Sequence, residues 1–449
     1  MESDKKGGPA QVKPIQRRAT QGPLDAPNLD ESIIQETKEA AVPSHQPSTL
    51  APAPARTVSI IPRSSTPAYI PKKKFAYLLR TEIYHKLSIV NLPPAFREEF
   101  YIVSARDSLE SLLSKLESYL ATGRLLHAAH LSASILTSSV INPTDYTTIF
   151  ALFYIRLACL DLTGHTMIAA QESKALEDLS SEFYFIDTTD ELHEKTEFDV
   201  DENNGNKYKD HIAPWQLRVL AVRLQSLGFN DARRGIAGLY DLGFYARNQL
   251  SHKKLSKEDV QLWKTRLADL GIRVVNSLIE MGDMETARRT LAGLGPADSN
   301  QHKMRIAMLY LHTGDVRAAE SVMEGIHDDS KEILKCLLIM AEGNYIEAIA
   351  AWQDYLQSHL GKDDEGLILQ NLAVCMLFTG RLNESRKMLE TLVEHNHSFQ
   401  SLIFNLATIY ELCSERSSYA LKMALTESVA RQTSSGEVNI ERPNIEFKI

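Results

Sequence analysis

One stretch of the sequence has nearly the spacing of a calcium-binding loop. Asp199, Asp201 and Asn203 alternate as the first three ligands of such a loop do. The sixth position is Asn204, where a glycine should turn the chain, and the twelfth is Asp210, where a glutamate should bind the ion through two oxygens. Because the turn and the bidentate ligand are both missing, we interpret the stretch as a solvated loop.

Other patterns that could do chemistry are also incomplete. His127 and His130 lie one helical turn apart, but no acidic residue or cysteine close to them in the sequence completes a metal site. The four cysteines are widely spaced within apolar stretches, which favours core positions in a reducing compartment. No phosphate-binding loop, nucleophile elbow, zinc-protease motif or kinase motif occurs. We therefore predict a protein that is not an enzyme and that uses no cofactor and no metal ion.

A helical repeat organises most of the chain. Four stretches share an apolar helix, a glycine turn and a second helix with a small residue five positions after the glycine. The glycines are Gly282, Gly314, Gly343 and Gly380, and the small residues are Ala287, Ala319, Ala348 and Ser385. The glycines are 32, 29 and 37 residues apart, close to the roughly 34 residues of a tetratricopeptide repeat. Glycine supplies the positive φ that ends the first helix, and the small residue lets the second helix pack closely.

The same template continues more loosely at both ends. Gly123 and Gly164 have an alanine at the same distance, a degenerate unit surrounds Gly228, and Ser414 stands where the last glycine would be. These units give about eight helix pairs between residues 107 and 430. We predict an all-α fold, namely a right-handed α-solenoid of tetratricopeptide-like helix pairs.

The segments around this array differ from it in composition. Eleven of the 17 prolines lie before residue 75. Since proline interrupts helices and this stretch buries little apolar surface, we predict a disordered Pro-rich tail over residues 1–70 and a helical lead-in over 71–106. Eight acidic residues against one lysine within residues 187–202 predict an exposed acidic loop, inserted in the array at 187–210. Residues 431–449 are expected to form a C-terminal tail.

The overall composition excludes several classes of protein. With 43% hydrophobic and 24% charged residues, the chain is neither wholly disordered nor a fibre. A net charge of −9 disfavours nucleic-acid binding. No apolar run reaches the ~18 residues that cross a bilayer, and no secretory signal is recognisable, so we expect a cytoplasmic protein. The run Lys72–Lys74 could touch an acidic membrane or be the solvated end of the tail.

Polar residues on the first helices could bind a partner, because these helices line the concave groove of such an array. Some tetratricopeptide proteins clamp a partner's C-terminal carboxylate with lysine and asparagine of one repeat and basic residues of the next two. Asn276 and Arg305 occupy two clamp positions, but Ile272 replaces the lysine and Ser330 the last basic residue. An adaptor that binds short peptide tails, like a co-chaperone, is therefore the alternative function.

Two further asparagines have matching places in consecutive repeats. Asn371 and Asn405 both fall nine residues before the turn position. Their side chains could bond a partner's backbone, or they could satisfy neighbouring helix ends.

The last repeats also carry a family resemblance. QNLAVCMLFTGRL at residues 370–382 resembles the N-x-A-V-C-x-L-x-x-G segment of the trafficking protein particle (TRAPP) complex subunit 12 family. SLIFNLATIYEL at residues 401–412 is similar to that family's final helix, and Pro214, Trp215 and Arg218 are similar to its entry into the middle repeats. The resemblance covers roughly residues 107–430.

This resemblance implies a non-catalytic scaffold subunit of a TRAPP III-type tethering complex, so no catalytic residues carry over. Such a complex supports nucleotide exchange on a Rab-family GTPase during endoplasmic reticulum-to-Golgi transport and autophagy. The implied partners are subunit 11 and the small-subunit core, with the GTPase as an indirect partner. The implied location is peripheral, at early Golgi and intermediate membranes, with membrane association only through the complex.

Overall fold

The computed structural model describes residues 74–90, 97–104, 106–187, 209–251, 255–295, 299–359, 364–413 and 418–431. These residues form sixteen α-helices, each packed on its neighbours in the sequence. The first eight are α1 (Leu109–Thr122), α2 (Leu125–Thr137), α3 (Tyr146–Leu162), α4 (Thr166–Ser173), α5 (Trp215–Gly228), α6 (Ala232–Leu250), α7 (Lys257–Glu280) and α8 (Met284–Ala292). The second eight are α9 (Asn300–His312), α10 (Val316–Glu324), α11 (Ser330–Ala341), α12 (Tyr345–His359), α13 (Glu365–Phe378), α14 (Leu382–Glu394), α15 (Gln400–Cys413) and α16 (Ser418–Arg431). The predicted α-solenoid of helix pairs is confirmed.

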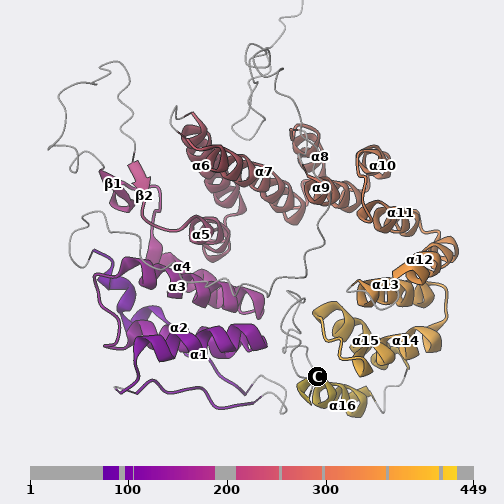
Figure 1. Ribbon diagram of the computed structural model, residues 1–449, viewed down its shortest axis with the longest axis horizontal. Helices are drawn as coiled ribbons and strands as arrows, with labels where there is room; N and C mark the ends of the chain where they lie inside the picture. Colours follow the sequence, from indigo (N-terminus) through magenta and orange to yellow (C-terminus); the bar gives the residue numbers. More distant parts are fainter. Residues whose placement is uncertain are drawn as a thin grey trace, which may run out of the picture.

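The helix pairs follow one continuous curve (Figure 1). Helices α9, α13 and α15 lie on the inside of the curve, and α10, α12 and α14 lie on the outside. None of the described helices is long and apolar enough to cross a bilayer. The predicted N-terminal tail, residues 1–70, and all but the first residue of the predicted C-terminal tail, 431–449, lie outside the described residues.

Glycine turns join the two helices of most pairs, as the repeat predicts. Six turn glycines have φ between 74° and 81°: Gly123, Gly164, Gly282, Gly314, Gly343 and Gly380. An aspartate follows two of these glycines, Gly282 and Gly314, and caps the second helix. Asp283 Oδ1 accepts a hydrogen bond from the Thr286 amide at 3.1 Å, and Asp315 Oδ1 accepts one from the Ala318 amide at 3.1 Å. The glycine thus ends one helix, and the next residue begins the other.

The small residues after these turns are enclosed between the two helices of each pair. Ala287, Ala319, Ala348 and Ser385 are all buried. Ser385 also donates a hydrogen bond from its Oγ to the Ala373 carbonyl at 2.7 Å, which joins α14 to α13. A larger side chain would force each pair apart, because helix interfaces are packed without space to spare.

The middle of the array departs from the template at Gly228. This glycine is the last residue of α5 and not the turn residue, because Asn230 takes the positive φ of 52°. A Cβ at Gly228 would lie 2.9 Å from the Ala170 carbonyl oxygen of α4. The glycine is therefore needed for the close approach of two helices. The helices that follow, α6 and α7, are long, with 19 and 24 residues.

A short antiparallel ribbon, which sequence reasoning missed, stands between α4 and α5. Strand β1 (Phe185–Asp187) pairs with β2 (Lys209–His211), and Phe185 lies opposite His211. Three-residue strands are too short to show a periodic pattern in the sequence. The predicted acidic loop at 187–210 begins and ends in this ribbon, and its residues 188–208 lie outside the described residues, as does most of the calcium-like stretch.

The lead-in expected over residues 71–106 contains only short helical turns in its described part. Two 3₁₀ helices, η2 (Ala76–Leu79) and η3 (Thr81–Ile83), precede turns and extended chain. Side chains hold the segment in place, since Phe75 is buried with its ring centroid 4.8 Å from that of Phe150 in α3. Burial of such aromatic rings helps to fix a segment that has little regular secondary structure.

Candidate interaction surface

The first helices of successive pairs lie beside one another along the C-terminal half. Helix α7 contacts α9, and α9 contacts α11. Ser401 of α15 donates a hydrogen bond to Gln370 of α13 at 3.3 Å, which sets those two helices side by side. All four sequence-predicted partner-binding residues lie on these first helices.

Helix α13 is buried on nearly every side and leaves one strip open. Leu367, Asn371, Val374 and Phe378 follow one another at intervals of four, three and four residues, which places them on one face. Leu367 is 47% exposed and Phe378 is 63% exposed. The Phe378 ring stacks on Tyr345 of α12, with centroids 4.6 Å apart and ring planes at 6°. The stacking therefore holds the two rings in place while the Phe378 ring stays exposed.

Helix α15 has a similar strip beside it. Phe404 is 63% exposed and Leu412 is 62% exposed, while Asn405 and Thr408 are half-buried between them. We call the open residues of α13 and α15 the inner strips. Each strip contains one of the predicted asparagines, Asn371 or Asn405.

The amide groups of Asn371 and Asn405 make no hydrogen bond within the described part of the chain. The alternative in which they satisfy neighbouring helix ends thus has no support among the described residues. A side-chain amide can both donate and accept, so each could bond the backbone of an extended segment lying along the strips.

The other two predicted residues are placed differently. Asn276 is exposed on α7, and Arg305 is exposed on the neighbouring α9. Arg305 Nη2 lies 2.8 Å from Asp269 Oδ1, and Arg273 Nε lies 2.7 Å from the other carboxylate oxygen. Burial alone would raise the pKa of Asp269, but the hydrogen bonds from the two arginines outweigh it and lower that pKa. Arg305 therefore has an internal counter-ion.

Sequence reasoning missed the exposed apolar side chains of the inner strips. Apolar residues occur all round α13, so nothing in its own sequence distinguishes the open face from the packed ones. Which face stays open is decided by α12, α14 and α15.

The described residues assemble no metal site. They contain no group of three or more His, Cys, Asp and Glu side chains that could hold a metal ion. His130 stacks on Phe100 with ring centroids 4.2 Å apart, and His127 Nε2 lies 3.1 Å from the Glu98 carbonyl. Both imidazole rings thus pack against the lead-in segment. The glycine turns, enclosed small residues and open inner strips define the chain as a tetratricopeptide-like α-solenoid with a surface suited to protein binding.

Comparison with known proteins identifies two relatives that are similar in sequence. No family model matches the chain. It is 28% identical over 188 residues to trafficking protein particle complex subunit 12 of Mus musculus, a match covering 38% of this chain and 23% of the relative. The Homo sapiens subunit 12 is 27% identical over 189 residues, covering 38% of this chain and 25% of the relative. The resemblance to the subunit 12 family is thereby confirmed.

The matched stretch spans about a quarter of the length of these curated relatives. Among solved structures, the crystal structure of the P58(IPK) TPR domain covers 73% of this chain and 94% of its own, with 12% sequence identity and a TM-score of 0.19.

Proposed function

We propose that the chain is a non-catalytic scaffold subunit of a TRAPP-type tethering complex, and that the inner strips form part of its attachment surface. The observation that carries the proposal is the exposure of Phe378 and Phe404 on neighbouring helices, around the free amides of Asn371 and Asn405. Large exposed apolar groups with polar groups between them are typical of protein interfaces. The similarity to subunit 12 supports a TRAPP-type complex as the partner of this surface.

The energetics favour a lasting attachment. Burying one exposed phenylalanine is worth about 1.5–3 kcal/mol, so two of them would change affinity by more than about a hundredfold. The stacked Tyr345–Phe378 pair is fixed before binding, which lowers the entropy lost on association. Such a surface fits a permanent subunit better than a transient carrier of peptides.

In its finer form, the proposal follows the family resemblance. The complex is of the TRAPP III type, subunit 11 and the small-subunit core are the direct partners, and a Rab-family GTPase is reached indirectly. The chain would then act in endoplasmic reticulum-to-Golgi transport and autophagy, in the cytoplasm and peripherally at early Golgi membranes. Residues 107–430 would form the binding array. The carboxylate-clamp alternative is not favoured, because Arg305 is already paired with Asp269.

A tagged pull-down from native cytosol at moderate salt tests this function. We expect one large particle that contains the small core subunits and subunit 11 in stoichiometric amounts. The variant Phe378→Ser/Phe404→Ser should lose these companions by at least about tenfold, while its helical circular dichroism stays unchanged because both side chains are exposed.

The matched control is Phe244→Ser on α6, a phenylalanine that is 54% exposed and lies outside the inner strips. This variant should retain every companion. If both variants lost their companion subunits equally, the cause would be the change in surface polarity and not the inner strips. Recovery of chaperones alone, at low stoichiometry, would replace the scaffold by the adaptor.

A further inference from the structure

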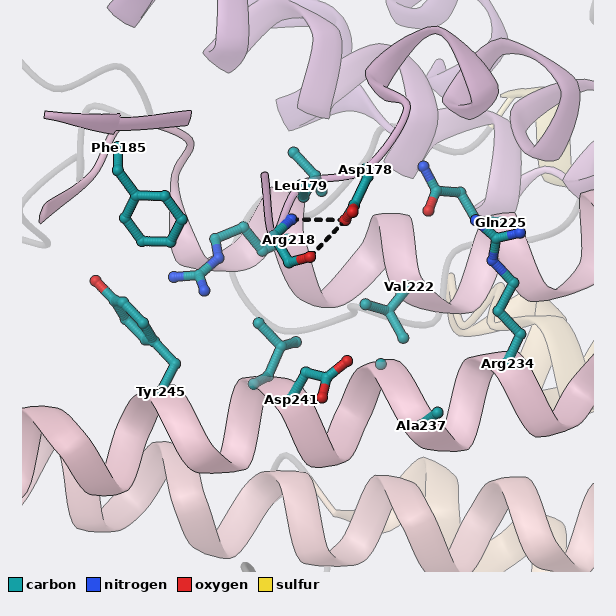
Figure 2. Close-up of a pocket in the computed structure, with 13 residues that line it drawn as sticks. Asp178, Leu179, Phe185, Arg218, Val222, Gln225, Arg234, Ala237, Asp241 and Tyr245 are labelled. Atoms are coloured by element: carbon teal, nitrogen blue, oxygen red, sulfur yellow. Dashed lines mark hydrogen bonds between the residues drawn. The ribbon is translucent and has the colours of Figure 1, made fainter. Parts of the chain in front are cut away.

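A cavity of about 290 Å³ lies between α5, α6 and the chain that leads into β1. Figure 2 shows that one helix, α6, supplies Arg234, Asp241 and Tyr245 along one side, whereas Arg218 reaches in from α5. The volume is at the lower end of the range for ligand sites, which suits one side chain of a partner better than a whole cofactor.

The guanidinium of Arg218 is enclosed without a counter-ion. Arg218 is only 6% exposed, and its Nε makes no hydrogen bond. Its guanidinium carbon lies 4.2 Å from the ring centroid of Tyr245 and 5.4 Å from that of Trp215. Figure 2 places the guanidinium between Phe185 and Tyr245. Aromatic faces stabilise a cation, but they do not accept a hydrogen bond from Nε in the plane of the guanidinium.

A second buried arginine shows what Arg218 lacks. Arg156 is 1% exposed and gives its Nε and Nη2 to the two oxygens of Glu172 at 2.9 and 2.7 Å. The same edge of Arg218 has no carboxylate opposite it among the described residues. A buried charge without such a partner is costly, and burial accordingly lowers the pKa of Arg218 to about 10.

The surroundings of Arg218 select the kind of anion. Arg266 stacks on the same Trp215 ring at 5.2 Å and adds positive charge nearby. Asp178 and Asp241 also line the cavity, and their carboxylates would repel a doubly charged phosphate more than a singly charged carboxylate.

The rest of the wall is apolar. Leu179, Phe185, Val222 and Leu242 line the cavity beside the arginine. A ligand that fits this lining presents one carboxylate together with an aliphatic neighbour. Acidic peptides supply both groups on adjacent residues.

We propose that this cavity binds a single carboxylate of a partner peptide, held by the guanidinium of Arg218 with an adjacent aliphatic side chain against the apolar wall. The inference does not rest on the scaffold function, because the cavity lies on α5 and α6 and the inner strips lie on α13 and α15. A peptide titration therefore succeeds or fails independently of complex assembly.

The test is a fluorescence-anisotropy titration of the full chain with a labelled, C-terminally amidated peptide that carries one central glutamate between leucines. Matched peptides carry glutamine or phosphoserine at the centre. A fourth carries no glutamate but ends in a free carboxylate. We expect the glutamate peptide to bind and the glutamine peptide to bind at least about tenfold more weakly. Equal binding by the free-acid peptide would assign the carboxylate to a chain end and would still support the site.

Three variants locate the binding. Arg218→Met should weaken the glutamate peptide at least about tenfold, and Ala237→Trp should do the same by filling the cavity that Ala237 lines, without removing a charge. Arg223→Met, on the exposed side of α5, should stay within about twofold. Circular dichroism confirms that each variant is folded.

Three results would overturn the proposal. One is a Kd for Arg218→Met or Ala237→Trp that equals the wild-type value. Another is preference for the phosphoserine peptide, which would make the site a phosphate site. The third is the absence of saturation by any peptide up to about 1 mM.

Discussion

Arg156 of α3 and Glu172 of α4 form a two-point ion pair whose side chains are 1% and 0% exposed. The remaining donors and acceptors are also used. Arg156 Nη1 donates to the Ala129 carbonyl of α2 at 2.9 Å, and Nη2 donates to the His85 carbonyl at 2.9 Å. The His85 amide donates to Glu172 at 2.8 Å. One ion pair thus connects three helices and the lead-in segment.

Removing one partner of this pair should be severely destabilising. Arg156→Met leaves Glu172 charged, buried and without its cation, which costs about 3–5 kcal/mol. Urea unfolding followed by circular dichroism measures the loss, and hydrogen exchange should place it in α1–α4, since repeat arrays unfold in parts. Arg223→Met is the control, because the Arg223 side chain in its ion pair with Asp161 is half-exposed, so its loss should cost less than that of the fully buried pair. Equal losses in the two variants would contradict a special role for the buried pair.

The opposite outcome is expected for the other buried arginine. Arg218→Met removes a charge that has no carboxylate partner among the described residues, and methionine fills similar space. Removing the charge avoids the free-energy cost of burying it. This gain exceeds the loss of two cation–π contacts, which are worth about 0.5–2 kcal/mol each. We expect the free energy of unfolding to be unchanged or about 1 kcal/mol higher. A fall of about 2 kcal/mol or more would mean that Arg218 has a structural partner.

The turn glycines give a prediction about backbone strain. Gly314 has φ of 75°, and alanine there should cost about 1–2 kcal/mol. Gly325 ends the following helix with φ of −84°, and a Cβ there would meet no atom closer than 3.5 Å. Gly325→Ala should therefore be neutral or slightly stabilising. Thermal unfolding of the two variants compares them directly, and a similar fall in Tm for both would show that φ is not the cause.

The repeat geometry could be predicted because it is local. A positive φ requires glycine, and a close helix contact requires a small residue. The residue types and the spacing of Gly314 and Ala319 therefore predict a turn and a helix contact. Gly228 shows the limit of this reasoning, since a glycine that permits close packing on α4 looks the same in sequence as a glycine that turns the chain.

The interaction sites could not be predicted in the same way. An arginine flanked by apolar residues, as at Arg156 or Arg218, indicates a buried charge. The sequence does not say whether a carboxylate from another helix reaches it. Likewise, the exposure of Phe404 depends on which faces of α15 its neighbours cover.

Reactivity toward a thiol reagent should distinguish the three core cysteines from Cys413 at the end of α15. Burial raises the pKa of Cys159 to about 12 and that of Cys336 and Cys375 to about 11. Cys413 is half-buried at the last position of α15. At pH 8, Ellman's reagent should modify one thiol per native chain and four after denaturation, because only the thiolate reacts. Cys413→Ser should abolish the native reaction, and a persistent signal in that variant would show that a core thiol is accessible.

The half-buried histidine beside the cavity makes stability depend on pH. His211 stacks on Tyr184 with ring centroids 5.8 Å apart, its Nε2 lies 2.8 Å from the Leu179 carbonyl, and its Nδ1 accepts a hydrogen bond from the Ala213 amide at 3.0 Å. Burial lowers the pKa of His211 to about 4, and the charge of Arg218 contributes. The folded chain therefore holds this imidazole neutral, with Nε2 as the donor.

The sign of the effect follows from the two protonation states. The unfolded histidine has a pKa of about 6.5, so between about pH 6.5 and pH 4 the unfolded chain binds a proton that the folded chain refuses. The contribution of His211 is complete above about pH 6.5 and is lost as the pH falls to about 4, a change of up to roughly 3 kcal/mol. Urea unfolding at pH 7.5 and pH 4.5 measures it, and His211→Gln keeps a donor but cannot titrate. The difference between wild type and this variant should shrink toward low pH, and a constant difference would mean that the pKa of His211 is the same in the folded and the unfolded chain.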